Sequence, residues 1–469
     1  MSNLVYGVKD RPGLWKTILF AFQQVLAILA ATIVVPVIIN GNTMKMFLAG
    51  DIAFYSEMSQ SAALLGAGVG TIVYLLFTRF KSPVFLGSSF AFLGSMTAAF
   101  AGAASASAGY LGLIIGAVMA GLVYVVIALI VKYAGVKWIN KIMPPAVIGP
   151  TVAIIGLSLS GNAIGDIFKG GLQINNVSVC SPYIALLCAM VTLAVIIICS
   201  VYGKKMMKII PFIIGICAGY ALAALFTVIG NATNVDALKV INFSLFENMQ
   251  WLPDFTFISA VDGFSAVTNW GGFIATLAVA YIPVAFVVFA EHLADHKNIS
   301  SIIGEDLLKE PGLHRTLLGD GVGSMAGAFF GGCPNTTYGE SVGCVAISGN
   351  ASVVTIFTAA VICIVASFVA PFVTLLATIP ACVMGGVCIT LYGFIAVSGL
   401  KMIQKVDLNQ NYNLFTVSVI LIAGVGGMTL TFGDITITSI ACALILGILV
   451  NLLGSKAAKK EATNNSDKE

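Results

Sequence analysis

Apolar runs of about 20 residues recur along the chain from Leu14 to Leu453, separated by short breaks where charges, prolines and glycines gather. A helical run of this length can cross the hydrocarbon core of a bilayer. The pattern therefore predicts an all-α polytopic membrane protein with fourteen transmembrane segments. The predicted spans are 15–40, 58–78, 84–105, 110–132, 143–163, 182–202, 209–230, 271–296, 316–332, 336–353, 355–379, 381–401, 413–430 and 435–454.

Composition agrees with this pattern. Of the 469 residues, 59% are hydrophobic and 9% charged, whereas soluble proteins carry about 25% charged residues. No polar stretch is long enough for a separate soluble domain, and the first apolar run is too long for a cleaved signal. We expect the polar tail at 455–469 to be disordered. The ten cysteines include no CxxC pair, so we expect small buried hydrophobes and neither a metal nor a cofactor.

Basic residues alternate between the two sides of the predicted topology. With the amino terminus inside, 20 of the 23 lysines and arginines fall in inside segments, and only Lys45, Lys169 and Lys239 fall outside. Cytoplasmic loops carry the excess of Lys and Arg in membrane proteins. The count therefore predicts that both termini are cytoplasmic.

A long outside connection at 231–270 divides the chain into halves at 1–230 and 271–454, each with seven predicted spans. Two similar halves with an odd number of spans insert in opposite orientations, as in many secondary transporters. "PVFLGSSFAFLGS" at 83–95 and "PNTTYGESVG" at 334–343 each open the third span of a half. "PPAVIGP" and "IPACVMGG" likewise open the two fifth spans. The matched order predicts two inverted repeats.

The two third-span motifs read as broken helices. Non-helical backbone is tolerated at membrane depth only where it is buried in protein or lines a cavity. We expect short antiparallel strands in spans 3 and 10, each leading into a half-helix whose first N–H groups are free. In the preceding span a glycine recurs every four residues, which should let a neighbouring helix approach closely. These glycines are Gly319, Gly323, Gly327 and Gly331.

Acidic residues inside spans are candidates for function. Glu291 and Asp295 in "VVFAEHLADHKN" stand one turn apart on one helix face, and Glu340 begins the tenth span. Asp295 has an alternative reading as an interfacial residue paired with His296 or Lys297.

Other polar residues in or near the predicted spans have structural interpretations. Asp320 and Asp434 stand at predicted span ends, where capping or solvation explains them. His292 and His296 have the four-residue spacing of metal ligands, but no third ligand is evident nearby. Gln23 and Gln24 stand mid-span, where they either face the site or bond another helix.

Two glutamates from different halves, together with free backbone N–H groups, describe a receptor for a small, planar, polar molecule. Carboxylates accept from ring N–H groups and backbone amides donate to ring carbonyls, a pattern that suits the amide/imide edge of a uracil-type ring. Phe90 and Tyr338 can flank the ring. Burial beside Asp295 should favour proton exchange at Glu291 near neutral pH.

The motifs "FLGSSFAF", "AEHLADH" and "CPNTTYGESVG" resemble those of the nucleobase–ascorbate transporter family, in its bacterial uracil permease branch, and the likeness covers nearly the whole chain. The resemblance implies a core domain of spans 1–4 (15–132) and 8–11 (271–379). It implies a gate domain of spans 5–7 (143–230) and 12–14 (381–454). It also implies uracil import with a proton by an elevator movement, in a homodimer of the inner or plasma membrane.

Carried over by residue, the resemblance makes Glu291 and Glu340 the substrate-binding glutamates and the backbone of Phe90 and Gly339 the amide donors. Tyr338, Ser89 and Tyr392 complete the substrate-binding set. Proton coupling falls to Glu291, Asp295, Glu340 and Gln24.

Three positions depart from the family's pattern. Asp295 replaces a frequent histidine, Gln23-Gln24 replaces a Gln-His pair, and Ser341 replaces a frequent asparagine. These departures leave open the proton relay, the coupling cation (proton or sodium) and the exact base.

Two other functions are alternatives to uracil import. One is a xanthine or broader nucleobase permease. The other is an anion exchanger or channel on the same architecture, which the two glutamates oppose because they would repel an anion. No nucleophile–base set indicates an enzyme.

Overall fold

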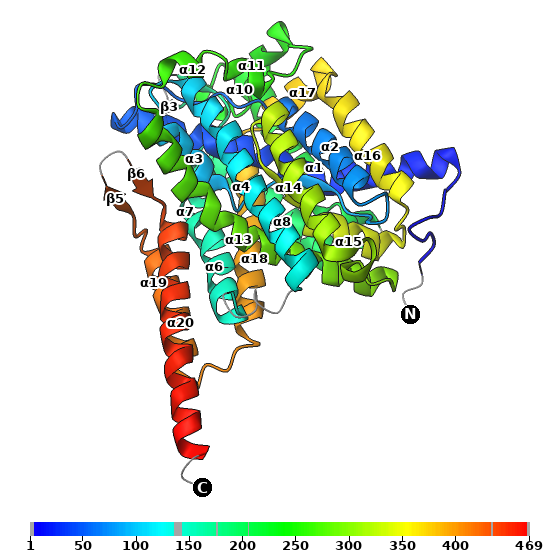
Figure 1. Cartoon of the computed structure of the whole chain (residues 1–469). Coiled ribbons are helices and arrows are strands. Elements are labelled where there is room, and N and C mark those ends of the chain that lie inside the picture. The colour runs from blue at the N-terminus through cyan, green and yellow to red at the C-terminus, as the bar shows by residue number, and fades with distance from the viewer. Residues whose placement is uncertain (1–3, 136–142, 175–176, 205, 433–434, 467–469) are drawn as a thin grey trace.

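The computed structural model describes residues 4–135, 143–174, 177–204, 206–432 and 435–466 (Figure 1). The helices and strands of the first half are α1 (Leu14–Ala49), α2 (Gln60–Phe77), β1 (Leu86–Ser88), α3 (Leu93–Ala101), α4 (Ala106–Ala134), α6 (Pro145–Ser158), α7 (Ser160–Asp166), β2 (Gln173–Ile174), β3 (Val177–Ser178), α8 (Pro182–Tyr202), α9 (Met206–Ile209) and α10 (Pro211–Thr233). The connection that follows contains η1 (Asp236–Leu238), η2 (Phe243–Asn248), α11 (Thr256–Ser259) and α12 (Gly263–Ala266).

The second half begins with the longest helix of this half. Its elements are α13 (Trp270–Ile303), η3 (Leu308–Gly312), α14 (Leu313–Gly331), β4 (Asn335–Thr337), α15 (Gly339–Ser348), α16 (Val353–Ser367), α17 (Ala370–Ala377), α18 (Ala381–Ile403), α19 (Asn411–Val425), β5 (Leu430–Phe432), β6 (Ile435–Ile437) and α20 (Ser439–Ser466). The chain is thus mostly helical, as predicted.

Within the described residues, eight helical segments are long and apolar enough to cross a bilayer, or nine if α16 and α17, bent by 83°, form one span. The other expected spans fall on shorter helices, on the apolar part of α20 at Ser439–Gly454, or on α14, whose His314, Arg315 and Asp320 lower its hydropathy. Fourteen spans and inverted repeats therefore stay predictions.

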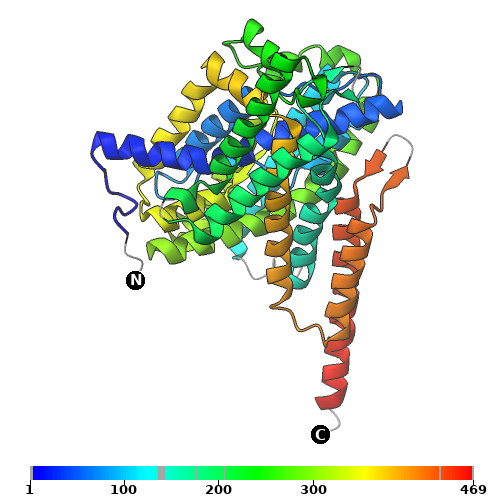
Figure 2. The same ribbon diagram turned by 180° about the vertical axis from the view of Figure 1, so that it is seen from behind.

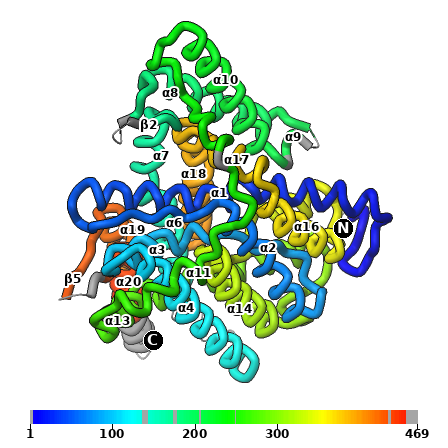
Figure 3. Tube along the Cα trace, turned by 90° about the horizontal axis from the view of Figure 1, so that it is seen from above, coloured from blue at the N-terminus to red at the C-terminus, as the bar shows by residue number. Residues whose placement is uncertain are grey.

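Helices of the two proposed domains form separate packing groups. α14 packs against α2 and α4, whereas α18 packs against α6, α8 and α10. Seen from above, α1 crosses the molecule with α8, α9 and α10 on one side and α2, α4 and α14 on the other (Figure 3). The strands β5 and β6 connect α19 to α20 beside the main body, and the C-terminal end of α20 extends away from that body (Figure 2).

Helix α20 continues to Ser466 and takes in most of the segment for which the sequence predicted disorder. The run "SKAAKKEA" is polar, but Ala, Lys and Glu are strong helix formers, and they extend a helix that has already begun.

The predicted glycine stripe on α14 is confirmed as a close helix contact. A Cβ atom on Gly323 would lie 2.8 Å from the carbonyl oxygen of Gly70, and one on Gly66 would lie 2.6 Å from that of Gly327. Glycines on both helices thus let the α2 and α14 backbones touch. The Asn335 side chain fills the space beside Gly327 and donates to the Gly66 carbonyl at 2.8 Å. This contact fixes β4 against the helix pair.

Candidate functional site

Two short strands from the two halves of the chain pair at the centre of the site. β1 and β4 are antiparallel, with Gly87 opposite Thr336 in the register. The pairing is extended by the Ser89 N–H, which donates to the Pro334 carbonyl at 2.9 Å, and by the Tyr338 N–H, which donates to the Phe85 carbonyl at 3.2 Å. Each strand leads into a short helix, α3 or α15. Strands form close to the predicted positions; their depth in a membrane stays a prediction.

Tyr338 locks the strand pair in place. Its hydroxyl donates to the Ser88 carbonyl at 2.7 Å, and its ring covers Gly87, where a Cβ atom would collide with it. The side chain is 4% exposed. The aromatic residue predicted to flank the substrate therefore also holds the two strands together.

A cleft of about 540 Å³ lies beside the strand pair and collects most of the predicted site residues. The acids Glu291 and Asp295 reach it from α13, and Glu340 reaches it from the first turn of α15. Its lining also includes Ser89, Phe90, Tyr338 and Gly339. The facing wall is mostly apolar and comes from the other packing group, with Val152 and Ile155 of α6, Phe212 of α10, and Leu391 and Phe394 of α18.

Asp295 belongs to this cleft. Its Oδ2 accepts a hydrogen bond from the Thr337 hydroxyl at 2.8 Å. The alternative reading, in which Asp295 pairs with His296 or Lys297, is not supported, because the described residues show no ion pair between Asp295 and either residue and its hydrogen-bond partner is Thr337. One turn of α13 thus presents two carboxylates to the same cavity.

Two predicted residues lie behind the cleft lining. The Gln24 amide donates to the Ser341 hydroxyl, which accepts from the Phe85 N–H at 3.1 Å. Gln24 therefore bonds another helix, one of the two possibilities that the sequence left open. Tyr392 is 3% exposed and packs edge-on against Phe90, with ring centroids 6.2 Å apart.

Another face of α13, about 100° round the helix from the acids, carries a buried polar network. His292 Nδ1 lies 2.7 Å from Asp320 Oδ2, and His292 Nε2 lies 3.0 Å from the Thr316 hydroxyl. His296 donates from Nδ1 to the His292 carbonyl at 2.8 Å, and its Nε2 lies 2.6 Å from the Tyr74 hydroxyl. All four ring nitrogens are thus engaged in hydrogen bonds.

The expectation of capping or solvation for Asp320 is wrong. This side chain is 1% exposed and lies in the middle of α14. Its hydrogen-bond partner is His292 of α13. Asp434, the other acid with this reading, lies outside the described residues. A signal for Asp320 was present in "LGDGVG", because an acid flanked by helix-packing glycines cannot lie on an open helix end. Sequence reasoning also missed Lys208, which joins the cleft lining.

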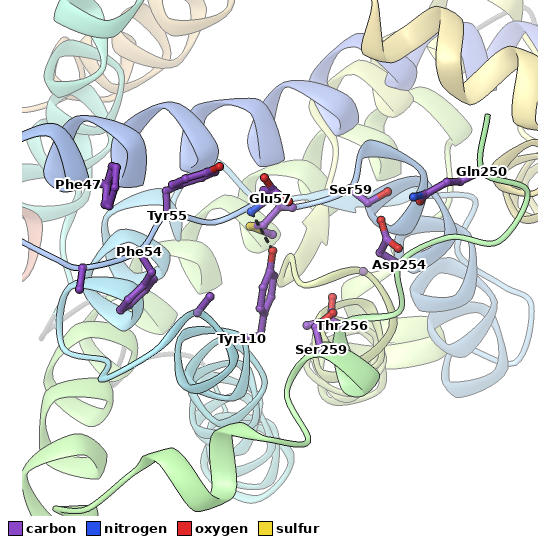
Figure 4. Close-up of a pocket in the computed structure, with 14 residues that line it drawn as sticks. Phe47, Phe54, Tyr55, Glu57, Ser59, Tyr110, Gln250, Asp254, Thr256 and Ser259 are labelled. Carbon is purple, nitrogen blue, oxygen red and sulfur yellow. Dashed lines mark hydrogen bonds between the residues drawn. The ribbon is translucent and has the colours of Figure 1, made fainter. Parts of the chain in front are cut away.

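A second cavity, of about 560 Å³, lies between the loop after α1, the start of α4 and the connection before α13. Figure 4 shows Glu57, Tyr110 and Asp254 around it; the Glu57 N–H donates to the Tyr110 hydroxyl at 3.0 Å. Partial burial, and then the nearby Glu57 carboxylate, raise the pKa of Asp254 in this loop. None of the predicted site residues lines this cavity.

The fold and the cleft together define a multi-pass membrane protein whose acidic site lies between two groups of helices, as in secondary transporters. Comparison with known sequences agrees. A family model described as a permease family matches residues 15–432. The chain is 38% identical to a uracil permease of Bacillus caldolyticus over 97% of this chain and 95% of that one. It is 34% identical to the uracil permease of Bacillus subtilis, over 97% of this chain and 96% of that one.

The protein therefore belongs to this permease family, the nucleobase–ascorbate transporters. Its relatives are permeases and not enzymes. Among solved structures, the transmembrane domain of the cyanobacterial bicarbonate transporter BicA matches with a TM-score of 0.57 at 17% identity, covering 95% of this chain and 98% of that one. Murine Slc26a9, an anion transporter, matches with a TM-score of 0.59 at 12% identity, covering 95% and 69% of the two chains. At these identities the structural likeness shows the shared fold alone.

Proposed function

We propose that the protein imports uracil together with a proton. The main observation in support is that Glu291 and Glu340 line one cleft together with the strand pair. Curated relatives named as uracil permeases, at 34% to 38% identity over nearly the whole chain, support the same substrate.

The cleft offers the donors and acceptors that a uracil ring needs. The amides of Phe90 and Gly339 donate to no other described residue, so both are available to ring carbonyls. The carboxylates of Glu291 and Glu340 can accept from the ring N–H groups. Free N–H groups at the start of α15 also favour an electronegative oxygen there. Phe90 and Tyr338 bound the ring on its apolar sides.

The acidic residues of the cleft are the basis for proposing that a proton is transported with uracil. Glu291, Asp295 and Glu340 share a cavity, and three carboxylates so placed cannot all ionise cheaply. A proton taken up with the substrate would relieve that repulsion. Gln24 would act through Ser341, since it reaches α15 and not the cleft.

Transport requires the cleft to open on either side of the membrane in turn. The acidic wall belongs to the proposed core and the apolar wall to the proposed gate, so an elevator movement of one group against the other would carry the site. The cleft lining includes Ser200, Lys208 and Met402, which adjoin segments predicted to be cytoplasmic. With both termini cytoplasmic, the cleft then reaches toward the cytoplasm. A homodimer would anchor the gate.

A xanthine permease is the second candidate, because a cleft of about 540 Å³ also admits a purine. An anion carrier is disfavoured. Its support is a shared fold, whereas three carboxylates and a single lysine among the described lining residues oppose anion binding.

Uptake of labelled uracil into cells or proteoliposomes tests the proposal. We expect uptake that a proton ionophore abolishes and that excess xanthine does not suppress. Glu340→Gln should abolish uracil binding, measured as the thermal stabilisation of purified protein by uracil. Glu57→Gln, an acid of the second cavity, should bind normally. Xanthine transport without uracil uptake, or normal uracil stabilisation in Glu340→Gln, would refute the assignment.

A further inference from the structure

A third cavity, of about 390 Å³, lies away from the cleft, between the N-terminal segment, the end of α2 and the start of α16. Its lining has two basic side chains and five apolar ones. The basic residues are Lys9 and Arg11, and the apolar ones are Val8, Phe80, Val353, Val354 and Phe357.

The N-terminal segment is held at this cavity by backbone hydrogen bonds. The Val5 N–H donates to the Gly349 carbonyl at 2.8 Å, the Ala351 N–H donates to the Tyr6 carbonyl at 2.9 Å, and the Val353 N–H donates to the Val8 carbonyl at 3.2 Å. Figure 3 shows this end of the chain beside α16. Lys9 and Arg11 are therefore carried by an ordered segment.

The apolar wall is built by an uncommon turn. Arg79 and Phe80 both have positive φ, 53° and 54°, a conformation that costs free energy for residues other than glycine. The turn sets the Phe80 ring against Phe357, with centroids 6.1 Å apart. Phe80 is 42% exposed and Phe357 37%. Aromatic surface of this extent is stable where lipid chains cover it.

Charge at the cavity is unbalanced. Neither Lys9 nor Arg11 forms an ion pair with a described residue. The nearby acids have other partners: Glu310 of the neighbouring η3, although close enough to interact electrostatically with Lys9, is bonded to Lys81, and Asp10 accepts from the Gly7 N–H at 2.7 Å. Trp15, at the start of α1, is 80% exposed, as expected for a residue at headgroup level. The cavity thus offers two free cations next to an exposed apolar wall.

We propose that this cavity binds an anionic phospholipid of the cytoplasmic leaflet. The phosphate of its headgroup would contact Lys9 and Arg11, and an acyl chain would cover Phe80, Val354 and Phe357. Basic pockets at this membrane level attract anionic headgroups. The inference rests on the proposed membrane orientation, and it is independent of the transported substrate.

Lipid binding here would also bear on the transport core. The bonded segment at 349–353 follows directly on α15, the helix that carries Glu340. A lipid that holds the N-terminal segment down would therefore stabilise the C-terminal end of that helix.

A tryptophan probe tests the site directly. Phe357→Trp is reconstituted in phosphatidylcholine vesicles that contain brominated phosphatidylglycerol or brominated phosphatidylcholine, with the parent protein as the background for its 4 native tryptophans. We expect the phosphatidylglycerol to quench the added indole more strongly. Lys9→Gln with Arg11→Gln should weaken this preference about 25-fold, since each basic side chain near an anionic lipid contributes about fivefold.

Lys401→Gln with Lys405→Gln is the matched control, because it removes two exposed lysines of the same predicted face outside the cavity. It should keep the preference. Equal quenching by the two lipids, or a preference that survives loss of Lys9 and Arg11, overturns the proposal. So does stabilisation of the detergent-solubilised protein by inorganic phosphate alone, if it depends on the same two residues. Uracil stabilisation of each variant separates a failure here from a failure of the proposed function.

Discussion

The buried contact between His292 and Asp320 gives a quantitative test of the network behind the cleft. The Thr316 hydroxyl donates to the Leu313 carbonyl at 3.0 Å, so it must accept from His292 Nε2–H. One proton then lies between His292 Nδ1 and Asp320 Oδ2. Asp320 Oδ1 has no partner among the described residues, which suits a neutral carboxylic acid better than a buried carboxylate. We infer that Asp320 donates to a neutral histidine.

Asp320→Ala and Asp320→Asn should therefore differ. Alanine leaves Nδ1 buried without a donor, which costs about 1–3 kcal/mol, and the lost packing brings the loss of unfolding free energy to about 3 kcal/mol. Asparagine can still donate from its amide to Nδ1, so the loss should be at most about 1 kcal/mol.

Thermal and denaturant unfolding of the purified protein in one detergent measures both variants. Asp51→Ala, in the exposed loop after α1, is the control and should match the wild type. An Asp320→Ala variant as stable as the wild type would show that the contact contributes nothing. Equal damage by asparagine and alanine would instead show that His292 is charged and that the inferred proton position is wrong.

Three further variants probe the site and its support. Gly331→Ala should lower the free energy of unfolding by about 1–3 kcal/mol, because its Cβ would collide with the α2 backbone. Gly343→Ala, which has open space around it, should leave that free energy unchanged, and chemical denaturation compares the two variants. Tyr338→Phe should weaken uracil affinity about fivefold, because it removes the side-chain hydrogen bond to the Ser88 carbonyl that supports the strand pair; unchanged affinity in calorimetry would argue against this role. Asp295→Asn should shift the pH profile of uracil uptake, because one carboxylate fewer then faces the cleft; an unchanged profile would exclude coupling between the acids.

Local chemistry predicted the two strand–helix units, closely for β4, expected at 336–338, and less closely for β1, because the extended stretch was expected at 88–92. A proline, then small or hydroxyl residues and an aromatic, marked both positions, and strands form at 86–88 and 335–337. Helix ends were harder to predict, because a run of apolar residues shows how much of a helix can lie in lipid and does not show where the helix itself ends. The span predicted at 271–296 is helical to Ile303, where Gly304 takes a positive φ of 73° and ends it. The span predicted at 355–379 is a bent pair of helices.

Residue spacing alone could place site residues together only where they share an element; the meeting of Glu340 and Phe90 with the α13 acids was expected from the matched motifs of the two halves and from the family resemblance. Glu291 and Asp295 could be placed on one face from their spacing, and both line the cleft. The partner of His292 is 28 residues away on another helix, and no local pattern gives that contact. Lys208 likewise reaches the cleft from the other packing group.

The alternation in "EHLADH" links the two polar sets on α13. A residue on an α-helix is turned about 100° from the one before it, so Glu291 and Asp295 share one direction while His292 and His296 share another. Both histidines are fully buried and bonded, His292 to α14 and His296 to α2. These two bonds fix the rotation of α13, and they therefore fix the direction in which the acids point. Turning the helix by about 100° in one direction would place the imidazoles in the cleft, and turning it in the other direction would place the carboxylates on the side of α14. The histidine contacts thus hold the acidic face of α13 toward the cleft, and a substitution at His292 should weaken ligand binding although His292 does not line the cleft.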